Sequence, residues 1–536
     1  MIYRSYGKLD DPVERDGDGA FRAINTYLEP TSLEEGTVTE SINMRLNGDK
    51  ASLREGLSFK AGSVTLSYSA DTEQVFTSTT FQSPSDSTEY LAFATKDKVI
   101  LYNSANTSGI DIAYPGGEVV ALADKASFVQ VFDKLILFRG KNKRPLEWDG
   151  DVANDFLVKT SVASGSGIAM PNTEYGLSFR NRVIIPQPTD SPYTLIMSDS
   201  LDSNNFVASE AQFRINKGSA DKLVAFHGYL EDQIICFMEK SIHMITNVTT
   251  PSSAGVIEVT REYGCIARKS IVNSGPQIYF LSDAGIMVLQ QGLDPAKGLG
   301  VSISKVSGEA KPLTAPIADQ IKDINLSAVS GAVSKVFDNK VFFAFPTGSS
   351  TVNNTVWVYD ILGGAFISKD TFPSGFQIDD FVTLPFGTNP QRRQLFIAGP
   401  TGWYQYTGTG ATVDDSGRQI GSSASSATTA ITGTLTSRSF SLGSGGVKHW
   451  KGGQLGVETS NGDALSITLA TTDPDSSATV LTHSASTTEE ALLRFGGRVR
   501  GYSAKVSVSI TQGNPKIRHL LVEGSKGQLN GRRSIA

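Results

Sequence analysis

Acidic side chains beside glycine are the first residues in this chain whose types and spacing could do chemistry. The stretch GPQIYFLSDAGIMVLQ (275–290) places Ser-Asp-Ala-Gly between two apolar runs. Asp283 in such a loop could hold a metal or a substrate. The same four residues could instead form the turn of a hairpin, because Asp and Gly supply turn geometry and Gly accepts a positive φ.

The other acidic loops lack the spacing of a known site. Asp16 and Asp18 fail the calcium-loop pattern, because glycine stands where the third ligand is expected and no glutamate closes the loop. The stretch DGDVAND (149–155) fails for the same reason. Asp199 and Asp202, with Asn205, could serve a glycosidase, but a turn-dense loop needs the same residues for hydrogen bonds to its own backbone.

Nucleophiles and metal ligands are equally scattered. None of the five histidines has a second His or Cys at ligand spacing, and His243 alternates with apolar neighbours as in a strand. Cys236 and Cys265 lie in apolar surroundings, which favours two buried thiols over a reactive pair. We therefore expect no catalytic residue, no metal and no cofactor, and we predict that the chain is not an enzyme.

The elements that would position these residues are predicted to be strands. The chain has 52 Gly, 27 Phe and 16 Tyr, and its apolar runs are short, whereas helical periodicity is clear only in APIADQIKDIN (315–325). Strand–turn–strand units recur about every 40 residues, for example at 89–104, 127–151, 222–246 and 335–370. This spacing predicts an all-β protein built on a β-propeller of six or seven blades. In that pattern Ser282–Gly285 is one hairpin turn among many.

Composition divides the chain into four parts. Residues 1–60 carry fewer strand signals and predict an N-terminal arm or platform segment, and residues 61–413 predict the propeller. Residues 414–435 are rich in Ser, Thr and Gly and predict a linker. Residues 436–536 alternate polar and apolar residues and predict a C-terminal β-sandwich with a basic tail.

Charge is unevenly distributed. The net charge is −6, so no overall basic field draws the protein to nucleic acid or membrane, and no apolar run is long enough to span a bilayer. From residue 494 to the end, however, the sequence contains nine basic residues and only one acidic residue, Glu523. This excess is either a solvated tail or a contact with an acidic partner, protein or nucleic acid. The basic residues are Arg494, Arg498, Arg500, Lys505, Lys516, Arg518, Lys526, Arg532 and Arg533.

Several segments, taken in order, resemble the tail hub or nozzle proteins of short-tailed, podovirus-type bacteriophages, also called packaged-DNA stabilisation proteins. The opening NTYLEPTSLEEGTVTESINMRLNGDKASLREGLSF (25–59) is similar to the start of that family. RPLEWDGD, HGYLEDQIICFMEKSIHMIT and EYGCIARKSIVNSGPQIYFLSDAGIMVL resemble its blade strands. GQLGVETSNGDALSITLATTD and RFGGRVRGYSAKVSVSITQGNPKIRHLLVEG resemble its closing sandwich. The resemblance covers about two thirds of the chain in patches and is loosest at 291–330 and 408–436.

The resemblance implies a structural virion protein rather than a catalyst. It implies a homo-hexameric ring in the virion tail, assembled in the host cytoplasm, that seals the DNA channel and conducts DNA during ejection. Its partners would be the head-to-tail adaptor ring, tail fibre, spike or needle proteins, and viral DNA passing without specific binding, with no membrane insertion. We expect Arg494, Arg498, Arg500, Lys516, Arg518, Arg532 and Arg533 to form the interface with the neighbouring tail ring.

Two other classes stay open. A carbohydrate-binding or carbohydrate-cleaving propeller for receptor recognition would need exposed aromatic platforms and a carboxylate pair. The only tryptophans, Trp148, Trp357, Trp403 and Trp450, lie in strand-like stretches that favour burial. A cellular propeller scaffold explains neither the N-terminal segment nor the terminal sandwich.

Overall fold

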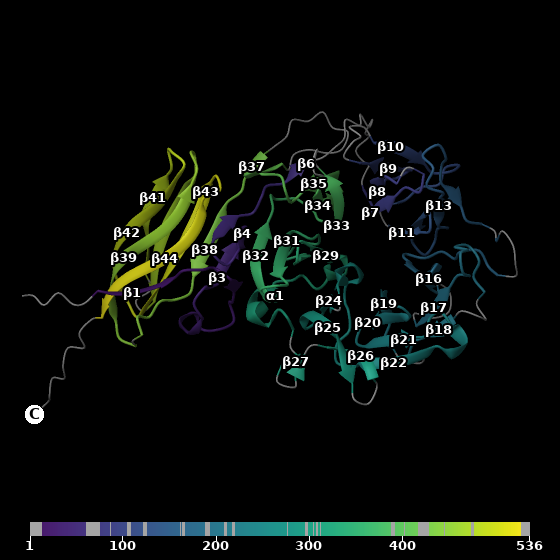
Figure 1. Cartoon of the computed structure of the whole chain (residues 1–536), viewed down its shortest axis with the longest axis horizontal. Coiled ribbons are helices and arrows are strands. Elements are labelled where there is room, and N and C mark those ends of the chain that lie inside the picture. The colour runs from purple at the N-terminus through teal and green to yellow at the C-terminus, as the bar shows by residue number, and fades with distance from the viewer. Residues whose placement is uncertain are drawn as a thin grey trace, which may run out of the picture.

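In the computed structural model strands predominate, and the described residues contain one short α-helix (Figure 1). No helix among the described residues is long and apolar enough to cross a membrane. The side chains of residues 291–310 and of Arg498 are not described. The described residues are 13–59, 75–85, 87–103, 109–121, 126–160, 162, 167–187, 193–207, 212–216, 220–275, 277–294, 298–303, 305–306, 309–310, 312–386, 392–400, 402–415, 428–443, 445–472 and 476–526.

Five consecutive antiparallel meanders form the first five blades of a β-propeller. Each begins with its innermost strand, and the innermost strands of successive blades lie against one another around the ring. The blades are β7 (Thr77–Gln82), β8 (Glu89–Ala94), β9 (Lys98–Tyr102) and β10 (Ile110–Ala113); β11 (Ala126–Val131), β12 (Lys134–Arg139), β13 (Leu146–Trp148) and β14 (Leu157–Val158); β15 (Leu177–Phe179), β16 (Arg182–Pro186), β17 (Thr194–Met197) and β18 (Gln212–Arg214); β19 (Leu223–Tyr229), β20 (Gln233–Met238), β21 (Ile242–Thr246) and β22 (Gly255–Thr260); and β23 (Val272–Ser274), β24 (Gln277–Ser282), β25 (Gly285–Asp294) and β26 (Gly298–Ile303).

The sixth separate blade closes the ring. It contains β33 (Asp380–Phe386), β34 (Arg392–Gly399) and β35 (Gly402–Gln405), and its outermost strand is β6 (Ser58–Phe59) from the N-terminal segment. Between the fifth and sixth separate blades lies a further meander of β29 (Val333–Phe337), β30 (Lys340–Phe345), β31 (Thr355–Asp360) and β32 (Ala365–Thr371), which belongs to a ten-stranded sheet. The predicted propeller is confirmed, with six self-contained blades and one position in the ring filled by a meander shared with the neighbouring domain.

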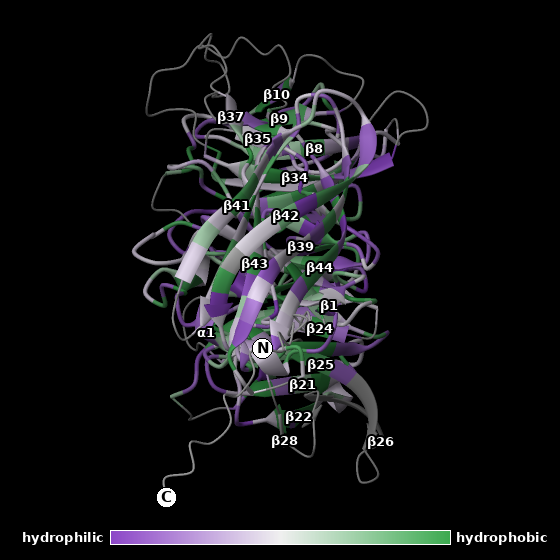
Figure 2. Cartoon of the chain, turned by 90° about the vertical axis from the view of Figure 1, so that its left-hand side faces the viewer, coloured by the Kyte–Doolittle hydropathy of each residue, from purple (hydrophilic) through white to green (hydrophobic). Residues whose placement is uncertain are grey.

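The predicted C-terminal sandwich is also present, and its strands come from both ends of the chain. One sheet has the order β4 (Met44–Leu46), β5 (Ala51–Leu53), β44 (Lys516–Lys526), β39 (Lys448–Thr459) and β42 (Glu489–Gly501), with β1 (Glu14–Asp18) beside β44. The facing strands are β3 (Thr37–Ile42), β38 (Gly433–Ser437), β43 (Ser503–Gln512), β40 (Ala464–Thr472) and β41 (Ser476–Ser484), with β2 (Ala23–Ile24) beside β3. Alternate residues of β40 and β43 are buried, as expected for a strand with one face in a core. Figure 2 shows hydrophobic and hydrophilic residues mixed along the strands of this sandwich.

The N-terminal segment therefore differs from the expected arm. Residues 14–59 supply five strands to the sandwich and the closing strand of the propeller. The physical reason is that β32, β38 and β44 would otherwise leave open edges: β3 pairs with β32 and β38, and β1 and β5 pair with β44. Of the expected linker, residues 416–427 lie outside the described residues, and the flanking strands β36 (Val413–Asp415) and β37 (Thr428–Ala430) pair with each other.

The two domains are joined by a continuous sheet and by buried ion pairs. Strand β3 pairs with β32 of the propeller on one side and with β38 of the sandwich on the other. Arg45 of β4 donates two hydrogen bonds of 2.6 Å to the fully buried carboxylate of Asp370 in β32. Arg54 likewise donates to both oxygens of Asp414. This arrangement makes the chain one elongated body rather than two domains on a hinge.

The remaining elements are short. The helical stretch expected at 315–325 begins with a 3-10 turn and continues as α1. These elements are the helix α1 (Ala318–Ile321), the 3-10 turns η1 (Pro30–Ser32), η2 (Pro251–Ser253), η3 (Arg268–Ser270), η4 (Ala315–Ile317) and η5 (Val329–Gly331), and the strands β27 (Lys305–Val306) and β28 (Glu309–Ala310).

Candidate functional site

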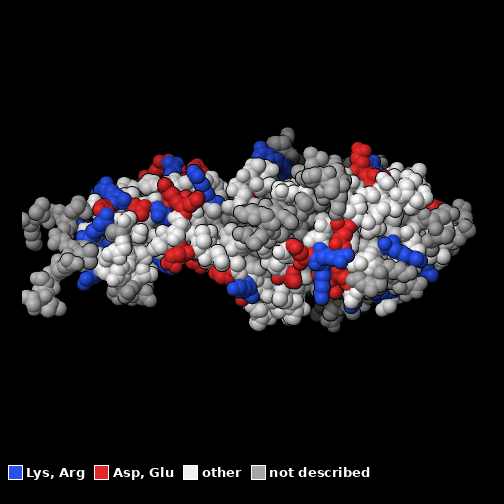
Figure 3. Space-filling view, turned by 90° about the horizontal axis from the view of Figure 1, so that it is seen from below, with Lys and Arg blue, Asp and Glu red and all other residues white. Residues whose placement is uncertain are grey.

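The basic residues predicted from the sequence fall into two groups on one face of the sandwich. Arg518 of β44 donates to Glu458 of β39 at 2.5 Å and to Glu490 of β42 at 2.9 Å, and the Lys516 ammonium lies 3.7 Å from Glu458. These two cations are therefore already paired within the sheet. Lys526, at the end of β44, pairs in the same way with Glu14 of β1. Counting charges along the sequence therefore overstated the basic character of this sheet. Seen from below in Figure 3, Lys and Arg are intermingled with Asp and Glu at the left-hand end of the molecule, over the sandwich.

The second group lies on β42 and in the tail beyond it. Arg494 and Arg500 of β42 are exposed and lie opposite Gln454 and His449 in β39. Neither guanidinium has an acidic partner among the residues that the structure describes. Arg498 lies in the same strand, with its side chain outside the description, and Arg532 and Arg533 lie outside the described residues. The structure thus brings Arg494 and Arg500 together on one strand, and their role as a tail-ring interface stays a prediction.

The Ser-Asp-Ala-Gly stretch forms the predicted hairpin turn, because Ser282 pairs with Gly285 where β24 meets β25. Gly285 is required here: its φ is +122°, and a Cβ atom would lie 2.2 Å from the Oγ1 atom of Thr314. Thr314 is buried and its hydroxyl accepts a hydrogen bond from the backbone of Ile286. The turn is therefore held against the segment that precedes α1.

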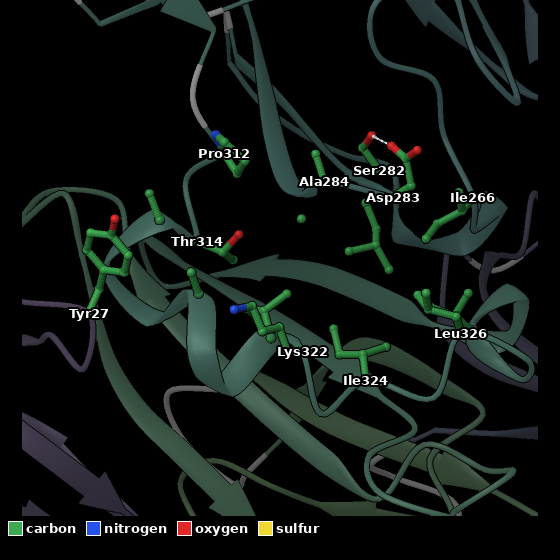
Figure 4. Close-up of a pocket in the computed structure, with 16 residues that line it drawn as sticks. Tyr27, Ile266, Ser282, Asp283, Ala284, Pro312, Thr314, Lys322, Ile324 and Leu326 are labelled. Carbon is green, nitrogen blue, oxygen red and sulfur yellow. Dashed lines mark hydrogen bonds between the residues drawn. The ribbon is translucent and has the colours of Figure 1, made fainter.

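A cavity of about 610 Å³ opens beside this turn (Figure 4). Its walls are mostly apolar and come from segments far apart in the sequence: the loop at Tyr27, Ile266, the turn at 281–285, and the stretch 312–329 that contains α1. Leu281, Ile324 and Val329 are buried in these walls. The polar side chains are few, among them Thr314, Asp283 and Lys322. Such a cavity suits the binding of an apolar group better than acid–base chemistry.

Sequence reasoning found the turn but missed the cavity. Asp283 is exposed at the cavity mouth, and its carboxylate accepts a hydrogen bond of 2.9 Å from Ser282. Tyr27, Lys322 and Leu326 carried no signal of their own, because only the fold brings their segments to the turn. The sequence around these three residues contains neither a repeated motif nor a charge cluster. It therefore gave no indication of a site.

The other acidic candidates are used within the fold. Asp16 and Asp18 both accept hydrogen bonds from Arg438, at 2.8 and 2.9 Å. Asp199 accepts from Asn205, so this loop stabilises its own turn as predicted, and Asp149 accepts from Asn154 within its loop in the same way. Among the described residues, no three His, Cys, Asp or Glu side chains gather as metal ligands would.

His243 and the tryptophans are likewise parts of the packed blades. His243 is buried in β21, and its Nε2 atom lies 3.0 Å from the hydroxyl of Ser241, which in turn donates to Asp221. Burial lowers the pKa of His243. The four tryptophan side chains are all buried, as their strand context predicted: Trp148, Trp357, Trp403 and Trp450. None of them forms an exposed platform for a sugar ring.

The two thiols are expected to be inert in the folded protein. Cys236 and Cys265 are buried in the fourth and fifth blade region, and burial raises the pKa of Cys265 to about 12 and that of Cys236 further. At about pH 8 neither forms an appreciable amount of thiolate. We expect Ellman's reagent to label no cysteine in native protein and both in denaturant. Rapid labelling of either cysteine in the native protein would contradict this prediction.

Comparisons with known proteins add little. No protein-family model matches the chain, and no curated protein matches it. Among solved structures, an extracellular domain from B. thetaiotaomicron is similar over 92% of this chain and 63% of its own, with 9% identity and a TM-score of 0.40. The exo-beta-1,3-galactanase of Phanerochaete chrysosporium is similar over 77% of this chain and 98% of its own, with 12% identity and a TM-score of 0.27. Neither likeness supports a functional argument, because both TM-scores are below 0.5.

Proposed function

We propose that this chain is a structural subunit of a phage tail, in which identical copies form the ring that seals the DNA channel and conducts DNA during ejection. The observation that carries the proposal is the junction of the two domains. One ten-stranded sheet runs from the propeller into the sandwich, and buried ion pairs lie beside it. A ring of identical subunits closes only if each subunit holds a fixed angle between its two interfaces, and a body without a hinge supplies that angle.

The charge distribution supports a conduit rather than a DNA reader. Duplex DNA carries one phosphate charge per about 1.7 Å of its length, so a strongly basic lining would retard its passage. The chain is acidic overall, and three of its nine C-terminal basic residues, Lys516, Arg518 and Lys526, are paired with acids on the same sheet.

The experiment that tests the proposal mixes the purified chain with the tail adaptor rings of its phage and examines class averages by negative-stain microscopy. Rings that carry this chain, with a central bore, are the expected result. Incubation with host polysaccharide is the companion assay. Release of reducing ends, with no ring formed, would favour a carbohydrate-cleaving propeller instead.

Arg494 and Arg500 are expected to guide docking onto an acidic face of the adaptor ring. Reversing both charges (Arg494→Glu with Arg500→Glu) should slow association with adaptor rings roughly tenfold at low salt, because charges at an interface mainly speed encounter and fix orientation. Biolayer interferometry across a salt series measures this rate.

A matched control reverses two exposed charges on the propeller, Lys96→Glu with Arg214→Glu, and so changes the net charge by the same amount. This control should associate at the wild-type rate. If the Arg494/Arg500 variant bound adaptor rings normally but lost binding to duplex DNA, the basic strand would be a DNA contact and the docking prediction would be wrong.

A further inference from the structure

The cavity beside the Ser282–Gly285 turn has an unusual rim. Tyr27 is 69% exposed and Leu326 is 64% exposed, and both line the cavity, at opposite sides of its mouth in Figure 4. Large apolar side chains exposed around an apolar hollow are typical of a surface that another molecule covers. A small ligand that filled the hollow would leave both rim side chains in water, whereas a peptide crossing the mouth would cover them.

The rim is also held in place before anything binds. The backbone amides of Tyr27 and Leu28 donate to the side-chain oxygen of Asn25, each at 3.1 Å. The amide of Thr26 donates to the carbonyl of Pro316 at 2.9 Å, and the Thr26 hydroxyl donates to Asp319. The loop that presents the Tyr27 ring is therefore fixed to the segment beside α1. A loop whose backbone is already ordered loses little conformational entropy on binding, which favours the use of its side chains as contacts.

The mouth carries one carboxylate and one cation. The Asp283 carboxylate accepts a hydrogen bond from Ser282 and points away from the hollow in Figure 4, so Lys322 is the charge that an occupant of the hollow would meet. The Lys322 ammonium has no ion-pair partner among the residues that the structure describes, and Figure 4 shows the side chain beside the hollow. Thr314, which is 2% exposed, accepts a hydrogen bond from Ile286, and its own proton has no acceptor among those residues. A cation and a hydroxyl donor facing an apolar hollow suit an acidic group next to an apolar one.

From these contacts we infer that the cavity is a docking site for a peptide segment of a protein partner, which inserts a large apolar side chain and places a neighbouring carboxylate against Lys322. Tyr27 and Leu326 flank the inserted side chain and exclude water from it, as the surroundings of a binding hot spot do. This inference does not depend on the ring proposed above, because it concerns the cavity and its rim only.

The test uses the full chain and two fluorescein-labelled probe peptides, acetyl-Ser-Glu-Phe-Leu-Ser and its counterpart with Lys in place of Glu. Fluorescence anisotropy should show that the acidic peptide binds more tightly than the basic one. Lys322→Glu and Leu326→Glu should each raise the Kd for the acidic peptide about tenfold. Lys322→Glu should also reverse the preference, so that the basic peptide binds better. That reversal distinguishes a direct contact from a loss of structure.

Leu362→Glu is the matched control, because Leu362 is 80% exposed and does not line this cavity. It should leave both affinities unchanged. The inference is wrong if neither peptide binds up to about 1 mM, or if Leu326→Glu and Leu362→Glu change binding equally. Binding of anilinonaphthalene sulfonate without binding of either peptide would show a site for a small amphiphile and would also overturn it.

Discussion

Replacing Asp370 by alanine is expected to lower the free energy of unfolding by about 3–5 kcal/mol. The Asp370 carboxylate is fully buried between the domains, where it accepts two hydrogen bonds from Arg45 and contacts the hydroxyls of Ser368 and Tyr406. The substitution leaves the Arg45 guanidinium, whose side chain is 17% exposed, without its counter-ion at the domain junction. Urea unfolding followed by circular dichroism measures the loss.

The chain contains a matched control for this prediction. Arg393 donates two hydrogen bonds to Glu89, at 2.9 and 2.7 Å, in the same two-pronged geometry but at an exposed site. Glu89→Ala should therefore lower the free energy of unfolding by no more than about 1 kcal/mol, since solvent screens the ion pair. Equal losses in the two variants would contradict the claim that burial makes the Asp370 pair important.

The same pair predicts how stability depends on pH. Although burial opposes ionisation of Asp370, the Arg45 guanidinium and its hydrogen bonds, with Arg54 and Ser368, hold the pKa of this carboxyl below its ordinary value of 3.8. A group whose pKa is lower in the folded state stabilises the fold above the ordinary value, and this contribution is lost as the pH falls through the folded value. Wild-type protein should thus lose stability below about pH 4 more steeply than Asp370→Ala. Parallel pH profiles would contradict this assignment.

Replacing Trp403 by alanine is expected to lower the free energy of unfolding by about 3–5 kcal/mol, because it leaves a large cavity in a packed core. Trp403 lies in β35 of the closing blade, and its ring contacts Phe93 and Tyr102 of the first blade at centroid distances of 4.8 and 4.5 Å. It therefore fills the seam where the two ends of the propeller meet. Urea unfolding measures the loss, and limited proteolysis should show earlier cleavage at this seam.

Leu362→Ala serves as the control for Trp403, because Leu362 is largely exposed at a turn. It should change the free energy of unfolding by less than about 0.5 kcal/mol. If Trp403→Ala cost less than about 1 kcal/mol, the seam would be closed by β6 and not by this aromatic cluster.

Local patterns in the sequence were enough to predict the blades. The turn at Ser282–Gly285 needs only a glycine at positive φ and two apolar strands, and these signals lie within a few residues of one another. The alternation in β40 and β43 is equally local, because every second side chain enters the core. The spacing of apolar residues and the residues at turns predict such strands and hairpins, even when the strands that pair with them are not known.

Contacts between distant segments could not be predicted in this way. Arg518 of β44 meets Glu458 and Glu490 only because β44, β39 and β42 lie side by side in the sheet, so a count along the chain showed excess base where the fold has ion pairs. The strands of residues 14–59 are short, and their partners are in most cases more than 300 residues away, so they looked like an arm. The cavity likewise joins Tyr27 to residues near 320, and no local signal connects the two.

A reconstruction of the intact phage tail tests the central claim most directly. The account predicts six copies of this chain in one ring around the DNA channel, each with its propeller and sandwich in the fixed arrangement of the single chain. A ring with three-, five- or twelve-fold symmetry, or the absence of this chain from the tail, would contradict it.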